Sequence, residues 1–293
     1  MADFNRGTGL LVIEVRNSNP NGDPDRESEP RTMATDERGI ISPVSFKRKV
    51  RDLVADKLGG AWKLAAERLG LPGDGAGFDI LESRGRDRKA IEKMDRDTFS
   101  STYWDGRVFG NTFLESMKGK NVDLDKVAHF ISTGTVQVGL GVSVAPIEIE
   151  RLTMTNKSGV QEGKDRGMAP LGFRVVRHGV YTMPFFVNPM MAHKNGCTAK
   201  DIDLLKFLVP HAYTQTASAS RPFVSVLHAW YAEHTSPLGS CPDPLIIDAL
   251  APRKTTEADR PSTALEESHV PKLDELPTEV RSRLKDVRDL CAA

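Results

Sequence analysis

The chain has 293 residues, and its 40 Lys and Arg side chains are balanced by 40 Asp and Glu side chains, so the formal net charge is zero. The length is enough to bury a sizeable core as one large or two small domains, whereas the neutral balance argues against a globally basic nucleic-acid binder and leaves only local charge asymmetry for such a role. Because no apolar run approaches about 18 residues and no signal pattern opens the chain, we expect a cytoplasmic protein without membrane contact.

The first predicted element is a strand over Gly9–Arg16, which is rich in apolar and β-branched residues. It leads into the run N-P-N-G-D-P-D at residues 19–25. Pro20 and Pro24 fix φ and restrict the residues before them, so the loop is expected to be stiff. A stiff loop can hold polar groups against an anion, or it can be a structural turn, and the spacing alone leaves both interpretations open.

A helix is predicted over residues 43–58, where apolar side chains recur at helical spacing. Ser42 is expected to be its N-cap and Pro43 its first residue, because the missing N–H of proline is unimportant there. The free N–H groups of a first turn attract anions, phosphate included. Lys47 and Arg51 are four residues apart and share a face, which indicates either a phosphate site or the solvated surface of an amphipathic helix.

The remaining segments alternate between strands, helices and polar stretches. In chain order, the patterns predict a helix over 62–69, a charged stretch over 83–96, strands over 135–149 and 171–187, a helix over 198–213, a strand over 223–231, an irregular stretch over 237–277 and a helix over 277–290. Glycines inside the 135–149 strand indicate a bulge or the close approach of another backbone.

The resulting order of strand, helix, strand, strand, helix and strand predicts an α+β fold of the ferredoxin-like class (β-α-β-β-α-β), which includes the RRM. We expect an RRM-like domain over residues 1–237, with insertions at 59–132 and 150–170, and a C-terminal tail over 238–293 that ends in a helix. Insertions of this size usually carry function. The predicted central strands lack the aromatic signature of an RRM, so ordinary RRM base stacking is not expected.

Two segments carry a local excess of positive charge. Residues 84–96 hold six basic and three acidic side chains, and residues 151–177 hold six basic and two acidic ones. A protein that binds a polyanion along one groove would show this pattern, and so would many proteins that bind nothing.

Several motifs, taken in chain order, resemble one known family. They are N-P-N-G-D-P-D at 19–25, E-P-R at 29–31, F-K-R-K-V-R at 46–51, R-V-F-G at 107–110, G-T-V-Q-V-G-L-G at 134–141 and H-G-V-Y at 178–181. Through them, over residues 10–234, the chain resembles the backbone subunit of type I CRISPR Cascade complexes, the Cas-seven family, and most of all its I-B and I-C branches. The loop and the basic helix are the most specific part of the resemblance.

The resemblance implies a subunit that polymerises head to tail along one CRISPR RNA and displays it for pairing with target DNA. Such a subunit has an RRM-like palm, a finger-like insertion, here 59–132, and a thumb hairpin, here 150–170, which displaces a base at regular intervals. The implied partners are CRISPR RNA, target DNA, further copies of the chain and the end-capping, large and small Cascade subunits. Open heterologous contacts generate helical filaments, and only backbone and shape contacts can serve every guide sequence.

The resemblance also implies which residues contact RNA. They are Asn19 and Asn21 in the loop, Ser42, Lys47 and Arg51 on the first helix, Gln137 on the glycine-containing strand, and Arg166 and Met168 in the thumb. Met168 would wedge beside a displaced base, or else be a core side chain at the base of the thumb. Arg84, Arg86 and Arg88 of the finger would contact the guide or target DNA, or else form a solvated, salt-bridged face.

The main alternative is a metal-dependent ribonuclease that cuts target RNA, as related type III subunits do with an acid in a loop of this palm. Asp23 and Asp25 lie in the loop and Glu14 on the strand before it, and paired carboxylates can hold a divalent metal. Since both aspartates belong to a turn signature shared by non-cleaving members, we favour turn capping and no enzymatic activity. A structural oligomer without nucleic acid is a third possibility.

No cofactor or metal is expected. The three cysteines show neither zinc nor disulfide spacing. His193 and Cys197 are four residues apart, but no second pair of ligands accompanies them.

Overall fold

The computed structural model of the chain describes residues 3–83, 88–92, 94–111, 132–156 and 169–292. Within these ranges, eight strands form one antiparallel sheet. Its order is β14 (Leu284–Asp289), β11 (Val224–His234), β1 (Gly7–Ser18), β10 (Ala169–Val187), β8 (Gly141–Pro146) and β4 (Arg38–Ile41), and β7 (Val136–Val138) and β9 (Ile149–Asn156) also pair with β10. The expected combination of helices with an antiparallel sheet is confirmed.

The strand predicted over 135–149 is divided into β7, β8 and the start of β9. The first break lies at Gly139, whose N–H donates to the Pro184 carbonyl oxygen at 2.7 Å. A Cβ at Gly139 would lie 2.8 Å from the Cγ atom of Pro184. The close backbone approach that the glycines indicate is therefore confirmed, and it interrupts the strand.

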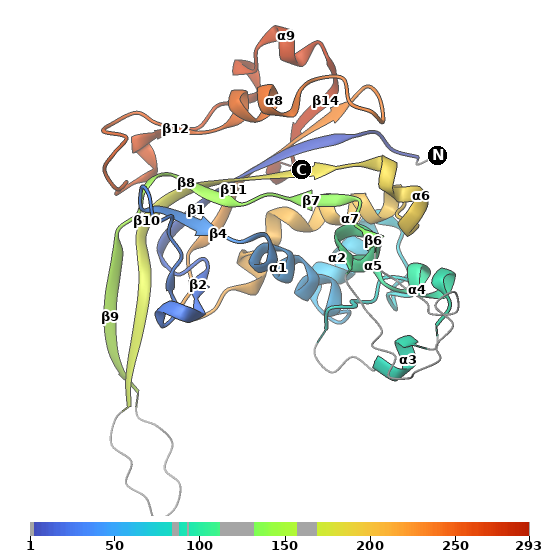
Figure 1. Cartoon of the computed structure of the whole chain (residues 1–293), viewed down its shortest axis with the longest axis horizontal. Helices are drawn as coiled ribbons and strands as arrows, with labels where there is room; N and C mark the ends of the chain where they lie inside the picture. Colours follow the sequence, from blue (N-terminus) through green and yellow to red (C-terminus); the bar gives the residue numbers. More distant parts are fainter. Residues whose placement is uncertain (1–2, 84–87, 93, 112–131, 157–168, 293) are drawn as a thin grey trace, which may run out of the picture.

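One face of the sheet is covered by α1 (Pro43–Ala55), α2 (Gly60–Leu69) and α7 (Ala199–Leu208), which lie below the sheet in Figure 1. Leu11 and Ile13 of β1 belong to the same buried cluster as Phe46 and Val50 of α1 and Leu204 of α7. Three of the four predicted helices are confirmed by these elements. The last of them ends at residue 208, and a 3-10 turn continues it.

The opposite face of the sheet is covered by residues of the C-terminal segment, where the sequence predicts an irregular tail. Leu10 and Val12 of β1 pack there with Ile246 and Leu250 of α8 (Asp243–Leu250). The short pair β12 (Arg253–Lys254) and β13 (Ser268–His269) lies in the same segment. Figure 1 shows this layer above the sheet, so both faces of β1 are buried.

The terminal helix predicted over 277–290 is wrong. Only α9 (Thr278–Arg281) is helical, and the chain then forms β14, which pairs with β11 at the edge of the sheet. Val280, Leu284 and Val287 repeat at helical spacing, which explains the prediction. Pairing with an open sheet edge and burial of Leu284 against the second face outweigh that local pattern.

The insertion over 59–132 is tied to α7 by Arg107 of the R-V-F-G motif. This side chain is buried, and its guanidinium donates to the two carboxylate oxygens of Asp201 at 2.7 and 3.1 Å and to the Gly77 carbonyl at 2.7 Å. The described elements of this region, besides α2, are α3 (Arg88–Glu92), α4 (Arg96–Thr102), α5 (Trp104–Phe109), β5 (Gly110–Asn111) and β6 (Ser132–Thr133).

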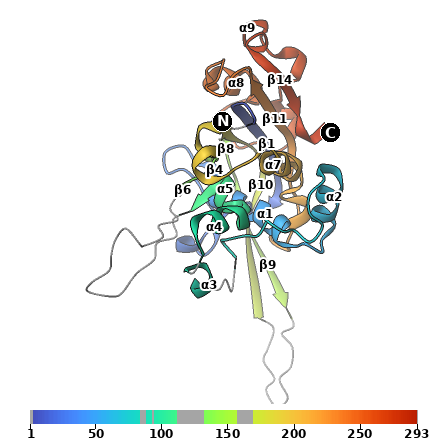
Figure 2. The same ribbon diagram turned by 90° about the vertical axis from the view of Figure 1, so that its right-hand side faces the viewer.

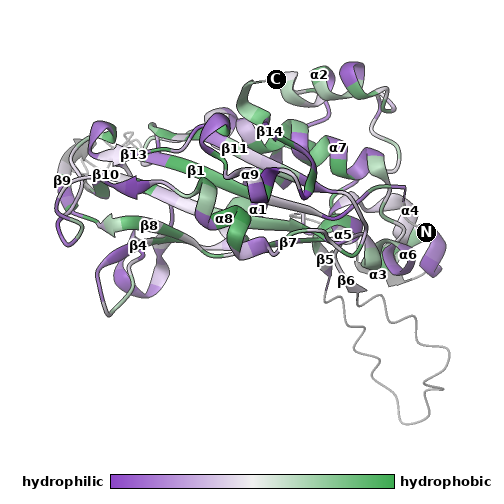
Figure 3. Ribbon diagram, turned by 90° about the horizontal axis from the view of Figure 1, so that it is seen from above, coloured by the Kyte–Doolittle hydropathy of each residue, from purple (hydrophilic) through white to green (hydrophobic). Residues whose placement is uncertain are grey.

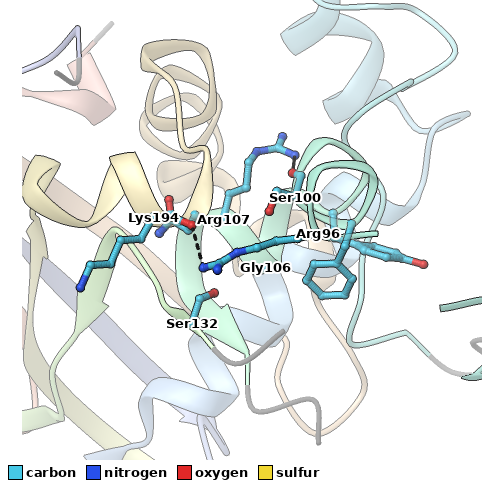
Figure 4. Close-up of a pocket in the computed structure, with 9 residues that line it drawn as sticks. Arg96, Ser100, Gly106, Arg107, Ser132 and Lys194 are labelled. Carbon is cyan, nitrogen blue, oxygen red and sulfur yellow. Dashed lines mark hydrogen bonds between the residues drawn. The ribbon is translucent and has the colours of Figure 1, made fainter. Parts of the chain in front are cut away.

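Figure 4 shows the joint next to Arg107, where Arg96 extends between Ser132 and Lys194 and donates to the Lys194 carbonyl oxygen at 3.4 Å. The cavity that these residues line has a volume of about 10 Å³. Such a space holds about one water molecule at most, so this is a structural joint and not a ligand site.

The pair formed by β9 and the first half of β10 projects away from the body of the molecule, as Figures 1 and 2 show. In Figure 3 the hydrophobic colour follows β1, whereas the end of the sheet near β9 is mainly hydrophilic. The remaining short elements are β2 (Gly22–Asp23), β3 (Glu29–Pro30), α6 (Ala192–Asn195), and 3-10 turns at Pro24–Arg26, Pro189–Met191, Val209–His211, Thr214–Thr216, Leu265–Glu267, Leu273–Glu275 and Leu290–Ala292.

Candidate nucleic-acid interface

The N-terminus of α1 is capped and braced by the loop that precedes it. Ser42 is the N-cap, and its Oγ accepts a hydrogen bond from the Ser45 N–H at 3.2 Å, as the sequence predicts. The Ser42 N–H in turn donates to Oδ1 of Asn21 at 2.7 Å. Asn21 therefore fixes the position of the first turn of the helix.

The N-P-N-G-D-P-D loop is held by its own side chains. Nδ2 of Asn19 donates to the Ser28 carbonyl at 2.7 Å, and Oδ1 of Asp23 accepts from the Asp25 N–H at 3.2 Å. Asp23 also lies 3.4 Å from Nη2 of Arg31. These contacts give Asp23 the capping role that the sequence favours, in a loop whose backbone is fixed from several sides.

A groove runs beside α1 and brings Lys47 and Gln137 together with Phe109, between the helix and the strands β5, β6 and β7. Its volume is about 350 Å³, and the exposed Val44 lies at its rim. The Lys47 ammonium lies 5.3 Å from the centre of the Phe109 ring. Burial lowers the pKa of Lys47, as does the nearby Arg51, while Glu82 opposes the shift.

Arg51 lies on the Lys47 face as predicted, but it is not free to bind phosphate. The residue is 4% exposed, its Nε lies 2.8 Å from Oδ2 of Asp105, and its Nη1 lies 3.2 Å from Glu82. Asp105 also accepts from the Leu81 N–H at 2.7 Å. The expectation that Arg51 contacts the guide is therefore corrected, because its guanidinium joins α1 to the insertion.

Two motifs of the sequence meet at the end of this groove. A Cβ at Gly134, which opens G-T-V-Q-V-G-L-G, would lie 2.3 Å from the backbone nitrogen of Gly110, which closes R-V-F-G. Gly110 has a φ of +78°, a conformation that glycine adopts readily. Both positions therefore require glycine. The close contact between them fixes the start of the segment that carries Gln137, which lies three residues after Gly134 at the groove.

A second basic cluster lies on the other side of α1 and could not be found from the motifs. Lys49 lies in the middle of α1, and its pKa is lowered by burial, then by the charge of Arg221 and also by that of Arg48, while Asp52 opposes the shift. Neither side chain has an acidic partner within 4 Å among the described residues. The Asn19 N–H donates to the Ser220 carbonyl at 2.8 Å, so the loop and the turn before β11 are in contact.

This cluster also holds buried polar atoms without a hydrogen-bond partner in the described part of the chain. They include Oδ1 of Asn19 and Nε of Arg221. Phe223, two residues after Arg221, is 57% exposed. Two cations whose charges interact, open polar atoms and an exposed ring are a suitable setting for a phosphate and an adjacent base.

Several residues expected to contact nucleic acid cannot be placed at this interface. Arg84, Arg86, Arg166 and Met168 lie outside the described residues, and Arg88 falls in α3. The basic excess predicted over 151–177 is reduced in the fold, where three of its arginines pair with acids from other segments or neighbouring positions. These pairs are Arg151–Glu29, Arg174–Glu27, Arg174–Glu29, Arg177–Glu148 and Arg177–Glu150.

Two acids of the ribonuclease alternative, Glu14 and Asp23, are engaged by other side chains. Glu14 points to the buried His178, with 3.4 Å between its Oε1 and Nε2, while Asp23 is engaged by Arg31 and the turn. Among the described residues, no three His, Cys, Asp or Glu side chains gather as metal ligands. Of the helices that the structure describes, none has the length and apolar character needed to cross a bilayer.

Comparisons with known proteins identify the family. The model of the family "CRISPR-associated protein Cas7" matches residues 5–271. A CRISPR-associated protein Cas7 of Haloferax volcanii is 27% identical over 242 residues, which cover 75% of this chain and 68% of that protein. Two solved structures align remotely. A "CRISPR RNA-guided surveillance complex, pre-nicking" chain has 17% identity and a TM-score of 0.46 over 78% of each chain. A "CRISPR RNA-guided surveillance complex" chain has 15% identity and a TM-score of 0.37 over 77% of this chain and 69% of that one. Because the family model spans nearly the whole sequence, this protein belongs to the CRISPR-associated Cas7 family, as its motifs indicated.

Proposed function

We propose that this chain is the CRISPR RNA-binding backbone subunit of a type I Cascade surveillance complex. It polymerises along the guide RNA and displays the guide for pairing with target DNA. Membership of the Cas7 family supports this role. The observation that carries the RNA-binding part is a pair of cations without an acid within 4 Å among the described residues, Lys49 in the middle of α1 and Arg221 before β11, which two distant segments bring together.

The fold supports an RRM-like palm. The order β11-β1-β10-β8, with antiparallel neighbours, is that of a β-α-β-β-α-β unit. An ordinary RRM binds RNA on its open sheet face, but here residues of α8 and the following segment cover that face. The guide is therefore proposed to pass over α1, between the Lys47 groove and the Lys49–Arg221 cluster.

The contacts available along this route suit a guide of any sequence. Lys47, Lys49 and Arg221 are donors for phosphate oxygens, which carry no base identity. The exposed ring of Phe223 offers a face on which any base can stack. The projecting β9–β10 pair is proposed to be the thumb that contacts the neighbouring copy, so that open heterologous contacts extend the filament.

We also propose that the chain does not cut RNA. The Asp23 carboxylate caps a turn and pairs with Arg31, and Glu14 is directed at His178, so these two acids serve the fold. Incubation of the complex with complementary RNA and Mg²⁺ or Mn²⁺ is the test. Cleavage that Asp25→Ala abolishes would replace this proposal with the ribonuclease.

The RNA-binding proposal is tested by the salt dependence of affinity for single-stranded guide RNA. Each lost phosphate contact should reduce the slope of log K against log salt by about 0.7. We expect this reduction in Lys49→Ala and in Arg221→Ala. Lys63→Ala, an exposed lysine on α2, should leave the slope unchanged. An unchanged slope in both test variants would remove the cluster from the interface, and sequencing of co-purified RNA identifies the ligand.

A further inference from the structure

We propose that Glu27 and Glu29 are positioning residues that fix the direction of the projecting β9–β10 pair. What the pair does rests on the proposed function, but its direction does not. The two acids lie in the segment that follows the N-P-N-G-D-P-D motif, and both reach the base of the pair. Residues 19–29 therefore connect the helix α1 to the projecting strands, and we call this segment the bracket.

Arg174 of β10 is the centre of this contact. Its guanidinium pairs with the carboxylates of both Glu27 and Glu29, and it also donates to the Glu27 backbone carbonyl. The Arg174 and Glu29 side chains are 21% and 22% exposed, whereas Glu27 is 80% exposed, so the contact with Glu29 is the more shielded of the two. A planar guanidinium with several fixed acceptors constrains orientation as well as distance.

The register of the strands explains why acids are needed at this position. Arg174 lies directly opposite Arg151 of β9, and like charges directly opposite one another destabilise an antiparallel pair. Oε1 of Glu29 lies 2.7 Å from Nη2 of Arg151 and 3.5 Å from Nε of Arg174. Glu29 therefore holds the two arginines together where they would otherwise repel.

The bracket is itself rigid. Glu27 and Ser28 have φ values of +50° and +64°, which non-glycine residues seldom adopt. Their conformation is held by the Ser28 N–H, which donates to the Asp23 carbonyl at 2.8 Å, and by Asn19, whose side chain binds the Ser28 carbonyl. Since Asn21 braces Ser42 from the same loop, one short segment sets both the RNA-binding helix and the projecting pair.

The direction can be measured in the free protein by electron spin resonance between nitroxide labels. Suitable label sites are Glu67→Cys on α2 and Thr153→Cys on β9, with Cys291→Ser to remove the partly exposed native thiol. The labelled protein with Glu27 and Glu29 intact should give a single narrow distribution of distances between the labels. In the Glu27→Gln, Glu29→Gln double variant this distribution should broaden, because neutral amides leave Arg151 and Arg174 to repel each other.

Two further variants make the result specific. Glu148→Gln removes an acid that pairs with Arg177 away from the bracket, and it should keep the narrow distance. Adding Arg151→Gln to the Glu27→Gln, Glu29→Gln double variant removes the repulsion and should make the distance distribution narrower again. A distribution that stays narrow without Glu27 and Glu29, or one that Arg151→Gln fails to narrow, would overturn the proposal.

A guide footprint separates this inference from the proposed function. If the wild-type complex shows no regular interruptions in nuclease protection, the thumb role fails, while the distances in the free protein still decide whether Glu27 and Glu29 set the direction of the pair.

Discussion

We expect Arg51→Ala to lower the stability of the fold strongly and to have a smaller effect on RNA affinity. The Arg51 and Asp105 side chains are 5% and 1% exposed, with 2.8 Å between Nε and Oδ2. Removal of the arginine leaves a buried carboxylate without its cation. Breaking a buried pair from one side costs roughly 3–5 kcal/mol. At about 2 °C per kcal/mol for a chain of this size, the melting temperature should fall by roughly 6–10 °C.

Thermal and urea unfolding of three variants would test the argument. Arg51→Lys keeps the charge but loses the planar fork that reaches both Asp105 and Glu82, so its loss should be intermediate. Arg51→Ala with Asp105→Asn removes the uncompensated charge and should recover part of the stability lost in Arg51→Ala.

RNA affinity measured at a temperature where the variants remain folded completes the experiment. A normal melting temperature in Arg51→Ala, combined with a loss of affinity and of salt slope, would refute the structural role and return Arg51 to the RNA contacts.

Three other predictions concern single positions. Burial lowers the pKa of Lys47, so RNA affinity should fall as the pH rises through that lowered pKa; Lys47→Arg, which stays charged, should abolish the fall in a binding titration. Gly134→Ala places a Cβ 2.2 Å from the Phe109 carbonyl carbon and should destabilise the protein in thermal unfolding; Gly172→Ala, which meets nothing within 4 Å, is the control and should not. Burial raises the pKa of Asp243, but hydrogen bonds from Arg6 and Thr8 outweigh burial, so the net pKa is lowered. The stability that Asp243 contributes is therefore fully present above the pKa of the unfolded state. It is lost as the pH falls through the lowered pKa of the folded state. The hydrogen-exchange protection factors of α8, which correct the observed rates for the intrinsic rate at each pH, should fall over that acidic range in the wild type and stay constant there in Asp243→Asn.

The sequence predicted local features well. The Ser42 cap, the Pro43 start of α1 and the strand β1 depend on neighbouring residues, whose preferences are readable in the chain. The helix predicted over 277–290 failed because its apolar spacing fits a helix, while the open edge of β11 offers strand pairing that no local pattern reports.

The site was predicted only in part, because contacts between distant segments leave no local pattern in the sequence. Helical spacing placed Lys47 and Arg51 on one face, but not Asp105, which neutralises Arg51 from 54 positions away. Lys49 lies off that face and Arg221 carries no motif, so only the folded chain brings them together. The acids Glu27 and Glu29 were likewise unreadable as partners of arginines more than 120 residues later.

The pairing of β1 has a consequence for biosynthesis. This early strand pairs with residues 176–187 of β10 and 224–233 of β11, which are synthesised much later. β14 then extends the same sheet. Such non-local pairing gives a high contact order and slow folding. A nascent chain that has emerged only as far as α1 has the lysines of that helix but lacks Arg221 and the folded sheet beneath it. The proposed phosphate site is therefore completed only after Arg221 has been synthesised and the sheet has formed.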